Sequence, residues 1–133
     1  MAASLIGTVT NPVRTQGLIT NPVSGSSHTL VELKGPGLFL SLELSKQGGG
    51  TDLTFIDLEI DGNNLVNISL AALLNQQLTS YNSYGLSIFP GKVLKTVTFG
   101  LPYPLTFKKS LKLSVIVSEP GVVQIVTNIL SAA

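Results

Sequence analysis

The sequence has no cysteine, no tryptophan and few charged residues. The absence of cysteine excludes disulfides, thiolate metal sites and a cysteine nucleophile. Only 11% of the residues are Asp, Glu, Lys or Arg, against about 25% in an average soluble domain. A soluble monomer normally keeps itself apart from other molecules with interspersed surface charge. We therefore expect a surface rich in Ser, Thr, Asn and Gln, part of which other chains cover.

The charges that are present nearly cancel. Eight Lys and Arg residues oppose seven Asp and Glu residues, which gives a formal net charge of +1. Binding to nucleic acid depends on clustered Lys and Arg, so we expect no nucleic-acid partner. No stretch reaches the roughly 18 apolar residues of a membrane span, so no membrane partner is expected. The N-terminus also lacks the basic region and long apolar core of a signal peptide.

The side-chain combinations that most enzymes need are missing as well. The chain has one histidine, His28, and no second histidine or cysteine to complete a metal site or a catalytic triad. It has no Gly-x-Ser-x-Gly motif, and the glycines at 48–50 are not followed by the Gly-Lys-Ser/Thr of a phosphate loop. We predict that the chain is not an enzyme and binds no cofactor.

Alternation of apolar and polar residues is the main structural signal. Apolar residues fall at every second position in 38–44, 54–60 and 111–117, which is typical of half-buried strands. Asp61-Gly62 between two such runs predicts a hairpin. Leu101-Pro102-Tyr103-Pro104 is interpreted as an extended linker. The strand from Val122 to Leu130 carries apolar residues on both faces and is expected to be covered on both.

One segment departs from this pattern. Leu70, Leu73, Leu74 and Leu78 fall at helical spacing, which predicts a short helix over about 68–78 with Asn67 or Ser69 as its N-cap. The whole chain, 1–133, is expected to form one all-β domain. We predict an antiparallel β-sandwich or jelly-roll-like barrel of about 8–10 short strands.

The N-terminal 27 residues are predicted to form an extended arm or edge strands. Thr10-Asn11-Pro12-Val13 recurs as Thr20-Asn21-Pro22-Val23, and Asn-Pro favours the start of a turn. Proline also removes a donor that a central strand needs. Neither copy is therefore expected to lie in the middle of a sheet.

Three carboxylates at alternate positions, Asp57, Glu59 and Asp61, resemble the start of an EF-hand loop. The twelfth position, which would be Glu in that motif, is Ile68. We interpret the three as the solvent-facing edge of a strand and predict no metal site. They remain the candidate ligands for a hard cation such as Ca²⁺.

Long stretches of the chain carry no charge at all. Residues 63–91 and 120–133 contain no Asp, Glu, Lys or Arg, but they are rich in Leu, Ile, Val and aromatic residues. Interface cores are depleted in Lys, Glu and Asp and enriched in aromatics. The predicted interface residues are Leu70, Leu74, Tyr81, Tyr84, Phe89, Val122, Val126 and Leu130. The two tyrosines suit packing inside the domain equally well.

In these whole-chain features the sequence resembles small β-sandwich proteins of virus particles, particularly bacteriophage capsid decoration (cement) proteins. The resemblance consists of short strands, low charge, connections rich in Ser, Thr, Asn and Gly, and uncharged segments such as residues 10–13. It implies a protein of the virion, assembled in the host cytoplasm, that binds and stabilises a capsid lattice. The implied partners are capsid protein and copies of the chain itself, with a trimer favoured.

Two other functions fit the sequence. A carbohydrate- or surface-binding module, such as an adhesin or fibre tip, would use Tyr81, Tyr84 and Tyr103 to stack on sugars, although the absence of tryptophan argues against it. A coat or shell subunit would build the lattice itself and would assemble into closed particles.

Overall fold

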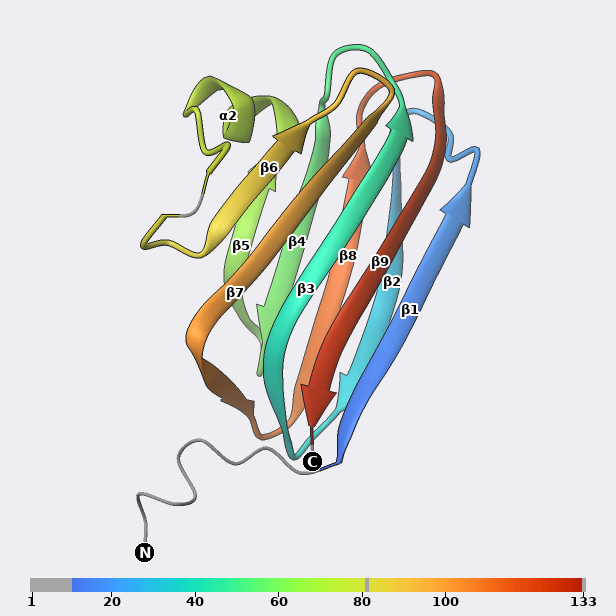
Figure 1. Cartoon of the computed structure of the whole chain (residues 1–133). Coiled ribbons are helices and arrows are strands. Elements are labelled where there is room, and N and C mark those ends of the chain that lie inside the picture. The colour runs from blue at the N-terminus through green and yellow to red at the C-terminus, as the bar shows by residue number, and fades with distance from the viewer. Residues whose placement is uncertain (1–10, 81, 133) are drawn as a thin grey trace, which may run out of the picture.

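The computed structural model describes residues 11–80 and 82–132, which fold into two antiparallel sheets packed face to face (Figure 1). The predicted all-β fold is confirmed, in its sandwich form, because the sheets do not close into a barrel. Alternating apolar side chains from both sheets fill the space between them. Removing this apolar surface from water is the main force that holds the two layers together.

The larger sheet has five strands in the order β1-β9-β3-β7-β6. Its strands are β1 (Pro12–Thr20), β9 (Val122–Ala132), β3 (Gly37–Gly48), β7 (Leu94–Phe107) and β6 (Leu86–Pro90). The smaller sheet has four strands in the order β2-β8-β4-β5. They are β2 (Ser26–Lys34), β8 (Ser110–Val117), β4 (Thr54–Ile60) and β5 (Asn63–Ser69).

The pairing follows the pattern of a jelly roll. Strands from the first half of the chain pair with strands from the second half, as β1 with β9, β2 with β8 and β3 with β7, while β4 pairs with its neighbour β5. One long hairpin wrapped into two sheets gives this order. β6 is an additional strand at the edge beside β7.

The turn predicted at Asp61-Gly62 is present and joins β4 to β5. Asp61 and Gly62 have φ angles of 52° and 82°, and two consecutive positive φ values define the type I′ turn that two-residue hairpins favour. The same left-handed conformation occurs in both copies of the Asn-Pro repeat, where φ is 53° at Asn11 and 48° at Asn21. β1 and β2 are edge strands of the two sheets, whereas residues 1–10 lie outside the described part of the chain.

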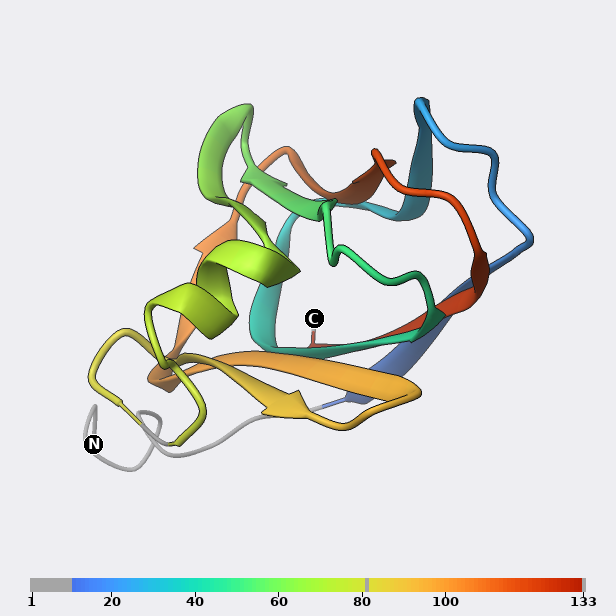
Figure 2. The same cartoon turned by 90° about the horizontal axis from the view of Figure 1, so that it is seen from above.

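The predicted helix is shorter than the sequence pattern indicates. α2 (Leu70–Asn75) begins two residues later than expected because Ile68 and Ser69 belong to β5. The Ser69 hydroxyl caps it by accepting the Ala72 N–H at 3.1 Å, and Gln77, at φ 58°, follows its last turn. Leu70 and Leu73 are buried. Figure 2 shows α2 over the gap between the sheets on the side of β5 and β6.

The sequence pattern predicted one continuous inward face for residues 38–44, and a β-bulge in β3 shows that this prediction was wrong for its first half. The alternation places Leu38, Leu40, Leu42 and Leu44 on one side, but the register shifts between Phe39 and Ser41. Phe39 therefore points into the core, where its ring stacks on Phe99 with centroids 5.8 Å apart. Leu42 and Leu44 are buried as predicted, whereas Leu38 and Leu40 are only half-buried.

The predicted linker at 101–104 is also corrected, because these residues are part of the long strand β7. The prolines at 102 and 104 lie where β7 skips in its register with β3, between the pairs of Gly100 with Ser41 and of Leu105 with Phe39. Proline has no backbone N–H, but at such an irregularity no hydrogen bond between β7 and β3 is lost by its absence. None of the helices in the described residues is long and apolar enough to cross a membrane.

Candidate functional site

One end of the sandwich, called the upper end here and drawn at the top of Figure 1, differs from the rest of the surface. It consists of the connections β1–β2, β3–β4, β6–β7 and β8–β9, at residues 21–25, 49–53, 91–93 and 118–121, with the adjoining strand ends. The jelly-roll order brings these four connections together although they are far apart in the sequence. It exposes several large apolar side chains among small polar residues and glycines.

Six large apolar side chains are exposed at this end. Phe89 is 71% exposed and Val93 is 65% exposed. Together they form a group that we call the upper rim: Val23, Leu53, Phe89, Val93, Leu94 and Val123. The connections that carry them are joined by backbone hydrogen bonds, since Gly48 donates to the Val93 carbonyl at 3.1 Å and Asn21 donates to the Val123 carbonyl at 2.8 Å. The rim is therefore part of the folded framework.

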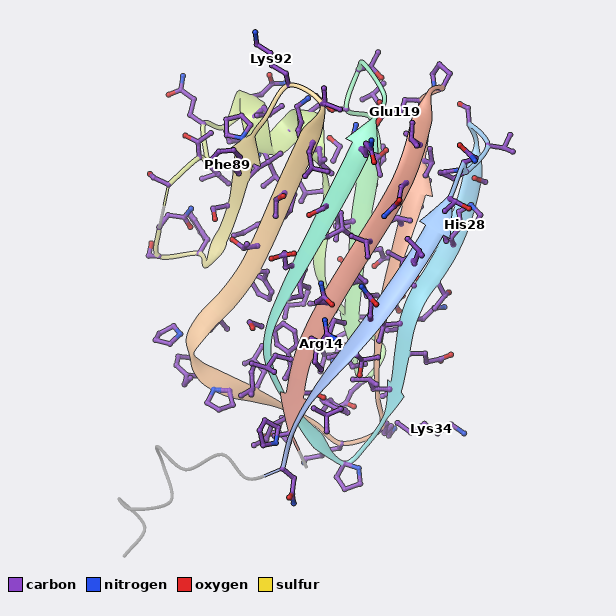
Figure 3. All side chains as sticks on the ribbon, turned by 45° about the vertical axis from the view of Figure 1, so that its right-hand side comes forward. Arg14, His28, Lys34, Phe89, Lys92 and Glu119 are labelled. Carbon is purple, nitrogen blue, oxygen red and sulfur yellow. The ribbon has the colours of Figure 1, made fainter. Side chains whose placement is uncertain are left out.

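The upper end is also almost free of exposed charge. Its four connections contain three ionisable residues, Asp52, Lys92 and Glu119, of which the first and last are buried. Lys92 projects into solvent at the top of the β6–β7 connection, whereas Glu119 lies between the strands (Figure 3). Large exposed apolar groups with little charge are typical of protein–protein contacts.

Below the rim lies a cluster of buried ions that the sequence analysis missed. The Lys46 ammonium, at the end of β3, is completely buried and donates to Asp52 Oδ1 at 2.7 Å and to Glu119 Oε2 at 2.8 Å. Lys95, on β7, lies 3.3 Å from Asp52 Oδ2. The cluster thus contains two cations and two anions, and this balance is what allows charges to be buried.

Glu119 holds the cluster together. Its carboxylate accepts from Lys46 and also from the Thr54 hydroxyl at 2.6 Å and the Asp52 N–H at 3.0 Å. In this way it ties the β8–β9 connection to the β3–β4 connection. One sequence signal pointed to the cluster: Lys46 continues the inward alternation of Leu42 and Leu44, so a lysine occupies a core position.

A row of polar residues crosses the outer face of the larger sheet, which also exposes Leu18 and Leu130. Gln16, Asn128, Glu43, Thr98 and Ser87 lie directly opposite one another across all five strands. Part of this face is a shallow groove of about 450 Å³, bounded by Arg14 on β1 and by Asn82 and Gly85 before β6. Arg14 donates to Asn128 at 3.3 Å. The groove offers hydrogen-bond donors and acceptors, together with the positive charge of Arg14 and the negative charge of Glu43.

An apolar crevice of about 380 Å³ opens on the side where α2 lies. It runs between β5 and the β6–β7 edge, and its lining comprises Leu65, Val66, Ile68, Gln76, Leu78, Tyr84, Leu86, Phe99 and Leu101. Tyr84, at its mouth, is 74% exposed. The crevice marks the side of the sandwich that no strand closes.

The predicted interface residues do not form a single surface. Leu70 and Val122 are buried in the hydrophobic core and cannot contact another molecule in this fold, because the helix docks through Leu70 and β9 turns Val122 inward. Leu74 packs partly against the core. Tyr84, Phe89 and Leu130 are exposed, Val126 is half-buried, and Tyr81 lies outside the described residues. Phe89 is the predicted residue that belongs to the upper rim.

Of the three candidate carboxylates, Asp57 and Glu59 lie on β4 and Asp61 lies in the turn that follows it, and the three do not converge. Asp57 accepts a hydrogen bond from Asn64, and Asp61 accepts from the backbone N–H groups of Lys108, Lys109 and Ser110. In the part of the chain that the structure describes, no three His, Asp or Glu side chains are grouped as a metal site would require. Asp61 instead links the β4–β5 turn to the β7–β8 turn.

These backbone bonds predict a pH-dependent contribution from Asp61. The N–H groups of Lys108 and Lys109 hold the pKa of Asp61 below its usual value of 3.8. A carboxyl whose pKa is lower in the folded chain stabilises it above the unfolded pKa, and that stabilisation is lost as the pH falls through the folded pKa. Asp61→Asn is therefore expected to lower the melting temperature at neutral pH, and the gap between variant and parent should close in acid. Thermal unfolding from neutral to strongly acidic pH measures this, and a gap that does not change with pH would contradict it.

Comparisons with known proteins show the fold and no family. No protein-family model matches the sequence, and no curated protein matches it. A chain of the acidic stable capsid structure of Helicobacter pylori bacteriophage KHP30 matches with a TM-score of 0.54 and 11% identity, over 95% of this chain and 90% of that one. The major capsid protein P2 from bacteriophage PM2 matches with a TM-score of 0.53 and 14% identity, over 91% of this chain and 51% of that one. A serine protease of Aeromonas sobria matches with a TM-score of 0.51 and 11% identity, and there the matched part is 28% of the protease chain.

Proposed function

We propose that this chain is a structural protein of a virus particle, and that it binds and stabilises a capsid lattice as a decoration protein. The observation that carries the proposal is the match to a chain of a phage capsid structure over nearly the full length of both chains. A second phage capsid protein shares the fold. Jelly rolls are common in viral capsid proteins, and the low charge of the sequence supports the same function.

The upper rim is the proposed contact surface. Burying Phe89, Val93 and their neighbours would remove apolar surface from water. It would cost little in lost hydration of ions, because Asp52 and Glu119 are already buried and paired within the domain. The ion cluster thereby keeps the carboxylates of two connections away from the surface that would dock. The proposed partners are capsid protein and further copies of the chain, as a trimer, within the virion.

The experiment is a size measurement on the purified chain over a wide dilution series, by light scattering and sedimentation velocity. We expect a concentration-dependent oligomer for the parent chain. Phe89→Ser combined with Val93→Ser should weaken association strongly, since losing one hot-spot side chain costs about 2 kcal/mol, or roughly 30-fold in Kd. Tyr103→Ser is the matched control, because Tyr103 is 61% exposed on β7 but lies away from the rim.

The outcomes separate the proposed functions. A chain that stays monomeric at every concentration and does not co-sediment with purified phage capsids would overturn the proposal. Closed particles formed by the chain alone would assign it to the shell itself. Equal weakening by the rim variant and by Tyr103→Ser would move the contact surface away from the upper end.

A second candidate function is carbohydrate binding, which the groove on the larger sheet favours, since polar side chains border a largely apolar lining. Asn82, Asn128, Glu43 and Arg14 present amide, carboxylate and guanidinium groups in one shallow depression, and sugars are bound through such groups. Lectins are another class with jelly-roll domains. A glycan array probed with the isolated chain tests this function, and binding should disappear in Asn128→Ala if the groove is the site. An array without signal removes this candidate.

A further inference from the structure

The buried cluster of Lys46, Asp52, Glu119 and Lys95 contains the parts of a condensation reaction. The Lys46 nitrogen is a potential nucleophile, completely buried and 2.7 Å from Asp52 Oδ1. At an ordinary hydrogen-bond angle, that contact places the nitrogen about 3.5 Å from the carboxyl carbon, at the upper end of the range for reacting atoms. We propose that Lys46 and Asp52 join in an intramolecular amide bond, formed by the folded chain itself with Glu119 as proton carrier.

The first step is a proton transfer within the buried pair. A low-polarity interior penalises charged groups more than neutral ones, so it narrows the free-energy gap between an ion pair and the corresponding neutral pair. Moving one proton from Lys46 to Asp52 converts the ion pair into that neutral pair. Glu119 can take up the proton, because its Oε2 lies 2.8 Å from the Lys46 nitrogen, and the backbone N–H of Asp52, which donates to Oε1 at 3.0 Å, holds it next to that residue. Glu119 therefore contacts the attacking nitrogen directly and is held beside residue 52 through its backbone.

The reaction balances without any further reagent. The neutral Lys46 amine attacks the carbon of the protonated Asp52 carboxyl, a C–N bond forms, and the carbonyl electron pair moves onto Oδ2. Glu119 removes a second proton from the nitrogen and delivers it to Oδ1. The C–O bond then breaks, one water molecule leaves, and the carbonyl re-forms as an amide. The Lys46 ammonium and the Asp52 carboxylate together supply every atom of the amide and the water, and Glu119 ends as a carboxylate.

The surroundings provide the other requirements. Negative charge that develops on Oδ2 would face the Lys95 ammonium, which is 3.3 Å away, the arrangement that stabilises an oxyanion. The Asp52 side chain is 10% exposed whereas those of Lys46 and Glu119 are not exposed, so the released water has a way out on the Asp52 side. A side chain at Gly49 would collide with Glu119 and approach the Lys46 nitrogen, so glycine leaves room for the cluster.

The test is the intact mass of the full chain, purified in its native state, incubated and then denatured. We expect a mass lower than the sequence mass by one water molecule. Trypsin should then fail to cleave after Lys46, so that residues 35–92 stay in one peptide, and fragment ions should be missing between residues 46 and 52. A folded chain that keeps the full sequence mass after prolonged incubation, and is cleaved at Lys46, overturns the proposal. The cluster would then be an ion-pair network only.

Variants assign the roles. The Lys46→Met variant should keep the full mass expected from its sequence. Asp61-Gly62 could also lose water by ring closure, and this pair is still present in Lys46→Met. A variant with the full mass therefore shows that the water lost by the parent does not come from Asp61-Gly62. Glu119→Gln should slow the reaction by about 100-fold or more, and Lys95→Met by about 100-fold. Lys112→Met is the matched control, because Lys112 lies opposite Glu59 on the outer face of the smaller sheet, and it should lose water like the parent.

Circular dichroism checks that each variant is folded, and a folded Glu119→Gln that reacts at the parental rate removes Glu119 from the mechanism. The proposal is independent of the function proposed above, since association and mass are measured separately.

Discussion

Replacing Glu119 with alanine is expected to lower the free energy of unfolding by about 3–5 kcal/mol, the usual cost of removing one partner from a buried ion pair. The variant leaves the Lys46 ammonium, the Thr54 hydroxyl and the Asp52 N–H without the acceptor that they share. It also unties the β8–β9 connection from the β3–β4 connection. Denaturation in urea or guanidinium, with ΔG extrapolated to water and with parent chain that still has its full sequence mass, measures the loss.

Two further variants make the Glu119 prediction specific. Glu43→Ala removes an exposed glutamate from β3, on the outer face of the larger sheet, and should change the free energy of unfolding by no more than about 0.5 kcal/mol. Lys46→Met combined with Glu119→Leu should be less destabilised than Glu119→Ala, because no uncompensated charge remains between the two positions. A Glu119→Ala variant within about 1 kcal/mol of the parent would mean that Lys46 finds another acceptor.

Replacing Phe39 with alanine is expected to cost about 3–5 kcal/mol, as large-to-small changes of buried aromatic residues do. Phe39 is 1% exposed and its ring stacks on Phe99, so the change leaves a cavity in the core between the two sheets. Leu40→Ala is the matched control on the next residue. Leu40 is only half-buried, and its loss should cost about 1 kcal/mol.

The comparison of Phe39 with Leu40 tests the bulge in β3 directly. If β3 continued the alternation of Leu42 and Leu44 without interruption, Leu40 would point inward and Phe39 outward. The costs of the two substitutions would then be reversed. Equilibrium denaturation of both variants under identical conditions decides between the two registers.

Much of the secondary structure was predictable because its causes are local. The alternation in 54–60 and 111–117 places side chains on opposite faces of a strand whatever its neighbours are, and the predicted inward residues Ile56, Leu58, Leu113 and Val115 are all buried. Asp-Gly gives a tight hairpin because both residues tolerate a positive φ. The helix at 70–75 was recognisable by its leucine spacing, and Ser69 was one of the two N-caps predicted for it. The sequence could not choose between Asn67 and Ser69, because that choice depends on Ile68 and Ser69 pairing with Ile56 and Phe55 in the sheet.

The candidate site was much less predictable. Phe89 belongs to the upper rim and was predicted as an interface residue, but the rim residues Val23, Leu53 and Val123 come from three other connections or their adjoining strand ends. Val122 was assigned to a surface and is buried, since nothing in an apolar run on both faces of a strand tells which side meets the core. The ion cluster joins residues 46, 52, 95 and 119, and no sequence motif marks such a set.

By itself, the sequence determined an all-β chain with little charge, one short helix, a hairpin at residues 61–62, and neither disulfides nor a cysteine nucleophile. These properties depend on composition and on spacings of two to four residues. Only the tertiary structure decided the jelly-roll order, the inward turn of Phe39, the burial of Lys46 beside two carboxylates, and the gathering of the upper rim. Each of these requires strands distant in the chain to pair in one register, and that register depends on how both sheets bury their apolar faces together.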